Sequence, residues 1–122
     1  MIDPVAPANG ESGGGQRLFS WSANFAPPPD TSFELVFWKP GQDPMVNSIG
    51  MAAPTANLNV TLDLERLDEQ LGALFDTGEY NWGVLLVRTT PAYERVKYLG
   101  GGRTFTYYRG GDPGSGGPSS GE

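Results

Sequence analysis

The sequence predicts a mainly β domain, an antiparallel two-sheet sandwich of about seven short strands with one short helix near residues 63–75. Three observations lead to this fold class. Apolar and polar residues alternate in several separate runs, Gly and Pro interrupt the chain between them, and a single segment has apolar residues at helical spacing. A chain of 122 residues is also long enough to bury a core as one domain.

The strongest strand signal follows a turn signal at residues 76–78. Side chains two apart on a strand share a face. One face here carries two aromatic and two aliphatic side chains, those of Tyr80, Trp82, Val84 and Leu86. Beyond Gly83 the opposite face is apolar as well, which is typical of a central strand that is covered on both sides at one end.

Strands are expected on both sides of a Pro-rich connection in the N-terminal half. Residues 16–23 and 32–38 both alternate, and the three prolines at 27–29 cannot continue a ladder between them. A short edge strand is expected near Val5, between two prolines that limit its hydrogen bonds.

The middle of the chain is expected to contain a strand followed by a helix. Residues 56–62 alternate, and residues 46–51 are a weaker candidate for a short edge strand. Apolar residues then fall at helical spacing from Leu64 to Phe75, with Asp63 placed as the N-cap. We expect this helix to cross from one sheet to the other.

The C-terminal part is less regular. Residues 89–102 form either a long loop or a hairpin arm. The glycines at 100–102 lack the Lys-Ser/Thr pair and the helix of a phosphate-binding loop, so we interpret them as a flexible loop. Residues 103–109 predict a last strand, and residues 110–122 a flexible Gly/Pro/Ser-rich tail or linker. The sandwich is thus expected to span residues 4–109, after an N-terminal flank of residues 1–3.

The alternation separates core aromatics from others. The expected core consists of Phe19, Trp21, Phe33, Leu35, Phe37, Leu58, Val60, Tyr80, Trp82, Val84 and Phe105. Four aromatic residues fall outside this pattern and are the candidate binding residues: Trp38, Tyr93, Tyr98 and Tyr108. Exposed aromatic rings stack on sugars or anchor protein partners, but they also cover sheet edges and neighbouring strands, so both interpretations stay open.

Composition excludes several classes of function. The chain has no Cys and no His, which removes thiol nucleophiles, thiolate metal sites and histidine bases. A net charge of −6 repels phosphate backbones and anionic lipid heads, so neither nucleic acid nor a membrane surface is an expected partner. We expect no cofactor, no bound metal and no insertion into a membrane, and we expect the isolated domain to be a monomer.

Carboxylate pairs are the remaining candidates for acid–base chemistry. Asp63 with Glu65, or Asp68 with Glu69, would suit glycoside hydrolysis if they faced each other across a cleft. All four lie on or beside the exposed side of the expected helix, where a solvated charged face is the simpler interpretation. No catalytic residue is therefore assigned, and a small acid-pair hydrolase is kept only as a third hypothesis.

Three segments together resemble a fibronectin type III domain, a member of the immunoglobulin-like sandwiches. They are the Phe19-Ser20-Trp21 run, the aromatic-x-aliphatic-x-aromatic run at residues 33–37, and the stretch Leu74, Gly78, Tyr80, Trp82, Val84. The opening Pro4, Pro7, Asn9, Gly10 and the closing Arg103, Phe105, Tyr107 are similar to the variant found in bacterial extracytoplasmic proteins.

This resemblance implies a function and one structural role. Tyr80 would be the tyrosine-corner residue, bonded back to the preceding turn. The chain would be a non-catalytic spacer or protein-interaction module of a larger bacterial surface or extracytoplasmic protein, whose leader lies outside this chain, and its partner a protein or a glycan. The alternative is a carbohydrate-binding module that uses Trp38, Tyr93 and Tyr98. The expected helix departs from the family, which usually has a short loop at that place.

Overall fold

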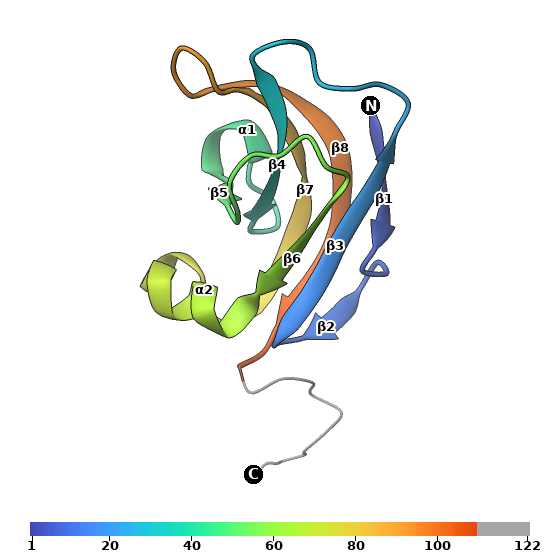
Figure 1. Cartoon of the computed structure of the whole chain (residues 1–122). Coiled ribbons are helices and arrows are strands. Elements are labelled where there is room, and N and C mark those ends of the chain that lie inside the picture. Colours follow the sequence, from blue (N-terminus) through green and yellow to red (C-terminus); the bar gives the residue numbers. More distant parts are fainter. Residues whose placement is uncertain (110–122) are drawn as a thin grey trace.

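Eight strands form two facing sheets in the computed structural model, which describes residues 1–109 (Figure 1). The three-stranded sheet has the order β1-β3-β6, and the five-stranded sheet has the order β2-β8-β7-β4-β5. The strands are β1 Ile2–Ala6, β2 Glu11–Gly13, β3 Gln16–Ala23, β4 Thr31–Trp38, β5 Ile49–Gly50, β6 Asn59–Asp63, β7 Gly78–Arg88 and β8 Glu94–Tyr107. The predicted mainly β, two-sheet architecture is confirmed, with one strand more than expected. The sheets are antiparallel except that β2 runs parallel to β8.

β7 is the central strand of the larger sheet. It pairs with β4 on one side and with β8 on the other, antiparallel in both cases. Its side chains are buried on both faces from Trp82 to Val87. The predicted central strand, covered on both sides at one end, is confirmed.

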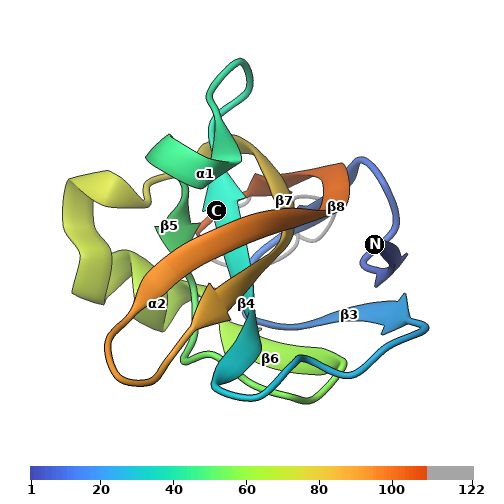
Figure 2. The same ribbon diagram turned by 90° about the horizontal axis from the view of Figure 1, so that it is seen from above.

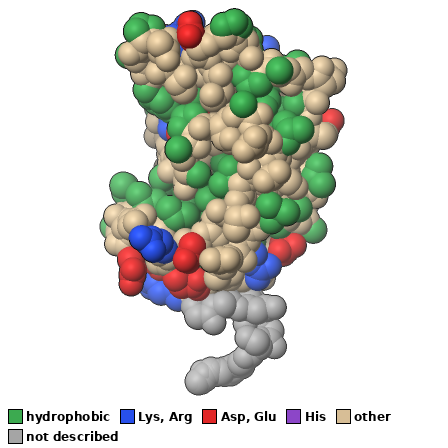
Figure 3. Space-filling model, viewed as in Figure 1, with side chains coloured by type: hydrophobic (Ala, Val, Ile, Leu, Met, Phe, Trp, Pro, Cys, Tyr) green, Lys and Arg blue, Asp and Glu red, His purple; other side chains and the backbone are tan. Residues whose placement is uncertain are grey.

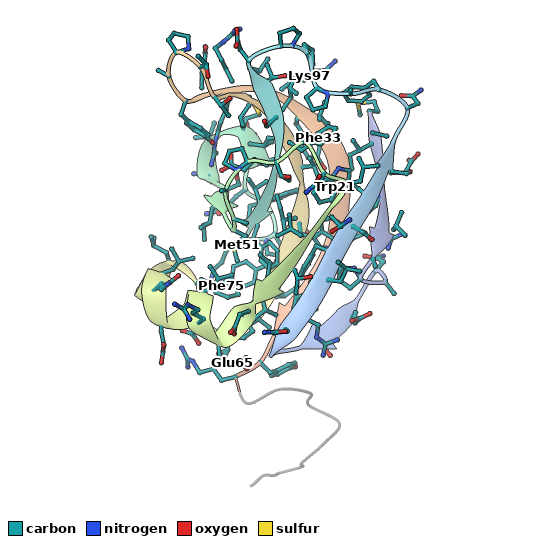
Figure 4. All side chains as sticks on the ribbon, viewed as in Figure 1. Trp21, Phe33, Met51, Glu65, Phe75 and Lys97 are labelled. Atoms are coloured by element: carbon teal, nitrogen blue, oxygen red, sulfur yellow. The ribbon has the colours of Figure 1, made fainter. Side chains whose placement is uncertain are left out.

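The core lies between the sheets and is dominated by aromatic rings. Phe19 packs against Phe37, Trp82 and Phe105, with ring centroids 5.3, 5.3 and 5.6 Å apart. Figure 4 shows how further side chains, labelled Trp21, Phe33, Met51 and Phe75, fill the space between the layers.

Most of the predicted core residues are fully buried, and the two exceptions are Leu58 and Val60. Leu58 is 40% exposed, because β6 begins only at Asn59 and Leu58 lies in the bend before it. Val60 is partly buried and packs against the core. Ile2, which was assigned to the N-terminal flank, is 4% exposed and belongs to the core, so the domain includes these first residues.

A hydrogen bond fixes the turn that leads into β7. The hydroxyl of Tyr80 donates to the backbone carbonyl of Asp76 at 2.9 Å, as predicted for this residue. Burial, together with the nearby Asp76 carboxylate, raises the pKa of Tyr80 to about 12. The hydroxyl therefore keeps its proton, and with it this bond, well above neutral pH.

The predicted helix is present as α2, Leu64–Leu71, followed by a 3₁₀ turn η1, Gly72–Leu74. Asp63 caps it, because its Oδ1 accepts from the backbone N–H of Arg66 at 3.3 Å. The α-helical part ends earlier than predicted, at Gly72, whose φ of 59° lies in the left-handed region. As expected, this connection leads from β6 in the smaller sheet to β7 in the larger one.

The strand predicted over residues 46–51 is mostly wrong. A one-turn helix α1, Pro44–Asn47, occupies its first half, and only the two residues of β5 are extended. Asp43 explains the difference, because its Oδ1 accepts from the N–H of Met45 at 2.9 Å and Pro44 suits the first turn of a helix.

Residues 89–102 belong to a hairpin arm, which decides between the two alternatives left open. β8 is one long curved strand, and the segment predicted as a separate last strand is its C-terminal half (Figure 2). The glycines at 100–102 lie inside this strand, so their interpretation as a flexible loop is wrong. Their φ values of 132°, 123° and 77° belong to a bulged region where the β7–β8 register shifts. Residues 110–122, interpreted as a tail, lie outside the described residues.

None of the helices in residues 1–109 has the length and hydropathy needed to span a membrane.

Candidate functional site

The four candidate aromatics are not gathered at one exposed place. Trp38 is only 5% exposed, and Tyr98 is half-buried. Tyr93 and Tyr108 are 53% and 44% exposed. Tyr108 follows β8 and bonds through its backbone N–H to the carbonyl of Gly13 in β2, whereas Tyr93 lies at the other end of β8. Tyr108 therefore does not join the other three.

Trp38 belongs to a second apolar cluster, on the outer face of the five-stranded sheet. Val36 and Trp38 of β4 lie there beside Leu85 and Val87 of β7, and all four are buried. Met45 of α1 and Tyr98 of β8 pack over them. Trp38 thus lies on the face opposite the main core, as the alternation predicts, and of the two interpretations left open its burial favours packing, because α1 and the curved arm of β8 cover this face.

The geometry of Trp38 and Tyr98 does not provide a flat platform for a sugar ring. Their ring centroids are 5.8 Å apart and the ring planes are inclined at 89°. A pyranose stacks on the face of an aromatic ring, so two perpendicular rings, one of them buried, cannot bind adjacent sugars in one plane.

A chain of hydrogen bonds holds the tip of the β7–β8 hairpin on this outer face. The hydroxyl of Tyr93 donates to Oε1 of Glu34 at 2.5 Å, and Nε of Arg95 donates to the Tyr93 hydroxyl at 3.2 Å. The guanidinium of Arg95 also donates to three carbonyls at the end of α1, those of Pro44, Met45 and Ser48, at 2.9–3.3 Å. This group ties β4, β8 and α1 together.

Glu34 and Arg95 belong to this group but were not among the candidates predicted from the sequence. Glu34 is 7% exposed, and Tyr93 covers its carboxylate. Burial, followed by the bond to Glu34, raises the pKa of Tyr93, so the phenol remains the donor. The available signal was the outer face of β4, where Glu34 is followed at the next two positions of that face by Val36 and Trp38, which are too apolar for a solvated surface.

The four acidic candidates cluster at the opposite end of the molecule, around α2. Figure 3 shows acidic and basic side chains gathered there, while the rest of that view is mostly apolar or uncharged. Asp63 is the helix cap, and Glu65 accepts from the backbone N–H of Gly15 at 2.6 Å. Glu65, Asp68 and Glu69 line a pocket together with Arg109.

Asp68 is the best-connected of these carboxylates. Its Oδ2 accepts from the Tyr107 hydroxyl at 2.8 Å and from Nε of Arg109 at 2.5 Å. The bond from Arg109 is the main reason why the pKa of Asp68 lies below the ordinary carboxyl value. Burial and the bond to Asp68 in turn raise the pKa of Tyr107. Asp68 thus remains ionised and serves as an anchor for the end of β8.

Acid should weaken the domain partly through Asp68. A carboxyl with a depressed pKa in the folded state stabilises the fold above its unfolded value, 3.8, and this contribution is lost as the pH falls through the lower folded value. Urea unfolding of wild type and Asp68→Asn should therefore differ at neutral pH and converge in acid. Glu69→Gln, an exposed change on the same helix, should follow the wild-type profile. A wild type and an Asp68→Asn variant with the same acid dependence would contradict the assignment.

The described residues bring together no three acidic side chains that could hold a metal ion. The glycines at 100–102 were considered as a phosphate cradle, but other parts of the protein fill the space beside two of them, Gly100 and Gly101. A Cβ placed on Gly100 would lie 2.9 Å from the carbonyl oxygen of Ile2, and one on Gly101 would lie 2.5 Å from the Cα of Gly83. They allow backbones to approach each other.

Comparison with protein-family models, with curated proteins and with solved structures finds no match to this chain.

Proposed function

We propose that this chain is a non-catalytic, immunoglobulin-like sandwich of fibronectin type III type, which serves as a spacer or protein-interaction module. By the resemblance in its sequence, it would belong to a larger extracytoplasmic or cell-surface protein of a bacterium. The order of the strands in the two sheets is the observation that carries this proposal.

The strand order agrees with an immunoglobulin-like sandwich. In such domains the first, second and fifth strands face a sheet that contains the third, sixth and seventh. β1, β3 and β6 occupy the first set of positions, and β4, β7 and β8 the second, with β5 beside β4. β2 then corresponds to a continuation of the first strand that moves across to pair with the last one.

Two further features support the proposal. The bond from Tyr80 to the carbonyl of Asp76 has the geometry of a tyrosine corner, since the hydroxyl reaches back to the backbone just before the strand. In addition, the N-terminus and the end of β8 lie at opposite ends of the sandwich (Figure 1). A module with this arrangement separates its neighbours along a chain, as a spacer does. The helix α2 remains a departure from the family.

The alternatives have less support. Trp38 is buried and so cannot contribute to carbohydrate binding, and Tyr93 is the most exposed of the rings that this hypothesis uses. The hydrolase hypothesis requires a carboxyl with a raised pKa as the acid. Among its candidates, Asp68 has a pKa that is lowered.

Titration with a panel of soluble polysaccharides tests the proposal. Amide NMR shifts are the appropriate measurement, because the three tryptophans are only 2%, 5% and 0% exposed and their fluorescence would respond weakly to a surface ligand. We expect no saturable shifts and no release of reducing sugar from any glycan.

Two variants make the outcome specific. Saturable shifts around Tyr93 and Tyr98 that Tyr93→Ala abolishes, while Tyr108→Ala keeps them, would establish carbohydrate binding instead. Release of reducing sugar that is lost in Asp68→Asn would establish a hydrolase.

A further inference from the structure

The two sheets have four edge strands, and they differ in how well they are protected. An edge strand exposes unpaired N–H and C=O groups that another extended chain can join, and proteins protect such edges with short strands, Pro, charged residues or bulges. In residues 1–109 the edges are β1 and β6 in one sheet and β2 and β5 in the other.

Three of these edges carry protective devices. β1 contains Pro4, an exposed Asp3 and a register shift between Pro4 and Ala6. β2 has only three residues, and Nη2 of Arg17 donates to the carbonyl of Ser12 at 3.3 Å. β5 has two residues and follows directly on α1. Each of them offers little regular backbone for a partner.

β6 is different. It has five residues, contains no Pro, and pairs with β3 without a register shift. Its one charged residue is Asp63, at the end where the chain turns into α2. Figures 1 and 2 show β6 outermost in its sheet, on the side away from β1. β6 is therefore the open edge of the described chain.

The hydrogen-bond pattern identifies the free groups on this edge. The N–H of Trp21 donates to the carbonyl of Leu58, its direct neighbour in the register, at 3.0 Å. Bonded and non-bonded pairs alternate along an antiparallel ladder. Val60 and Leu62 therefore point their backbone groups at β3. Thr61 points its N–H and C=O away, to the side where the described residues place no strand.

We propose that β6 pairs antiparallel with β6 of a second copy of this chain, with the two Thr61 residues opposite each other on a twofold axis. Each Thr61 donates its N–H to the carbonyl of the other. The two three-stranded sheets then form one continuous six-stranded sheet. This inference goes beyond the proposed function and depends only on the strand order and the register.

The register around Thr61 is self-complementary. On the outer face Asn59 of one copy lies opposite Asp63 of the other, so no like charges face each other. On the inner face Val60 lies opposite Leu62, and Val60, which is only partly buried, gains apolar cover. A shift by one residue would place polar outer side chains against apolar inner ones.

The surroundings favour a weak, salt-dependent dimer. Leu18, the neighbour of Thr61 in β3, is 50% exposed, and the charged groups in Figure 3 gather mainly around α2. The contact involves only a short strand from each copy, which is typical of a transient interface. The net charge of −6 also opposes association when salt does not screen it. The monomer expected from the sequence is thus the form at low concentration.

Sedimentation equilibrium from low micromolar to millimolar protein tests the proposal. The mass of wild type should rise toward that of a dimer, and it should rise further at higher salt. Thr61→Pro removes the free N–H without touching the ladder to β3, since Pro is tolerated on edge strands where its nitrogen faces solvent. This variant should associate roughly tenfold more weakly or worse.

Two further variants complete the test. Thr61→Lys places like charges on the axis and should also weaken association, which keeps the proposal testable if circular dichroism shows that the proline variant does not fold. Ser22→Lys adds the same charge on the same outer face but away from the edge. This control variant should associate more strongly than Thr61→Lys. A wild type that stays monomeric at millimolar concentration would overturn the proposal and leave this edge to a strand of another protein. Association as strong as that of the wild type in both Thr61 variants would also overturn it.

Discussion

Replacing Trp82 with alanine should lower the free energy of unfolding by about 3–5 kcal/mol, the range typical of a large aromatic side chain removed from a core. Trp82 is fully buried, and its ring meets that of Phe19 at 89° with centroids 5.3 Å apart. The substitution removes contacts between the two sheets at the central strand. Urea unfolding followed by circular dichroism measures the effect.

Trp82→Phe is the matched control for this prediction. The indole Nε1 of Trp82 is buried and has no hydrogen-bond partner among the described residues. The change to Phe therefore gives up no hydrogen bond and should cost clearly less than the change to Ala. If the alanine variant unfolds at the wild-type urea concentration, Trp82 is not a core residue of the protein in solution.

Gly101→Ala should destabilise the domain by about 3 kcal/mol or more, because it combines backbone strain with a steric clash. The φ of Gly101 is 123°, a conformation that residues with a Cβ rarely adopt. The added Cβ would also lie 2.5 Å from the Cα of Gly83 and 2.9 Å from the carbonyl oxygen of Trp82. These are backbone atoms of the central strand, which cannot move without disturbing its pairing.

Gly102→Ala separates the two causes. Its φ of 77° also lies in the left-handed region, but the nearest atom to an added Cβ is the Tyr98 hydroxyl oxygen at 3.5 Å. Only the conformational cost of about 1–2 kcal/mol then remains. Equal losses for the two variants in thermal or urea unfolding would show that β7 and β8 do not approach closely at Gly101.

Local alternation was sufficient to predict the strands that have one buried and one solvated face. β3 and most of β6 belong to this group. β7 was predictable because its apolar residues continue on both faces beyond Gly83, and α2 because its cap and apolar spacing are local signals. Elements whose structure depends on distant contacts could not be predicted. β2 has three residues and no period of its own, and it is extended because β8 lies beside it. The glycines at 100–102 indicate that the backbone is free to adopt unusual conformations. Whether this segment forms a loop or packs closely against β7 depends on Gly83.

The candidate site illustrates the same limit. Alternation correctly placed Trp38 on the face opposite the main core, but burial of that face depends on α1 and on the curvature of β8. A single Glu in an alternating strand is ordinarily a solvated residue. Glu34 is buried because Tyr93, far along the sequence, closes over it. Such covering contacts are tertiary and leave no periodic trace in the sequence.

The parallel pairing of β2 with β8 determines how the domain bears tension. The two strands lie near opposite ends of the chain and run in the same direction. A force that separates these ends pulls β2 backward and β8 forward, along the strands themselves. Backbone hydrogen bonds join them, from the N–H of Gly10 to the carbonyl of Thr104 and from the N–H of Tyr108 to the carbonyl of Gly13. The force then acts on these hydrogen bonds in shear, and on all of them at the same time. In a hairpin pulled open from one end, the same bonds would break one after another.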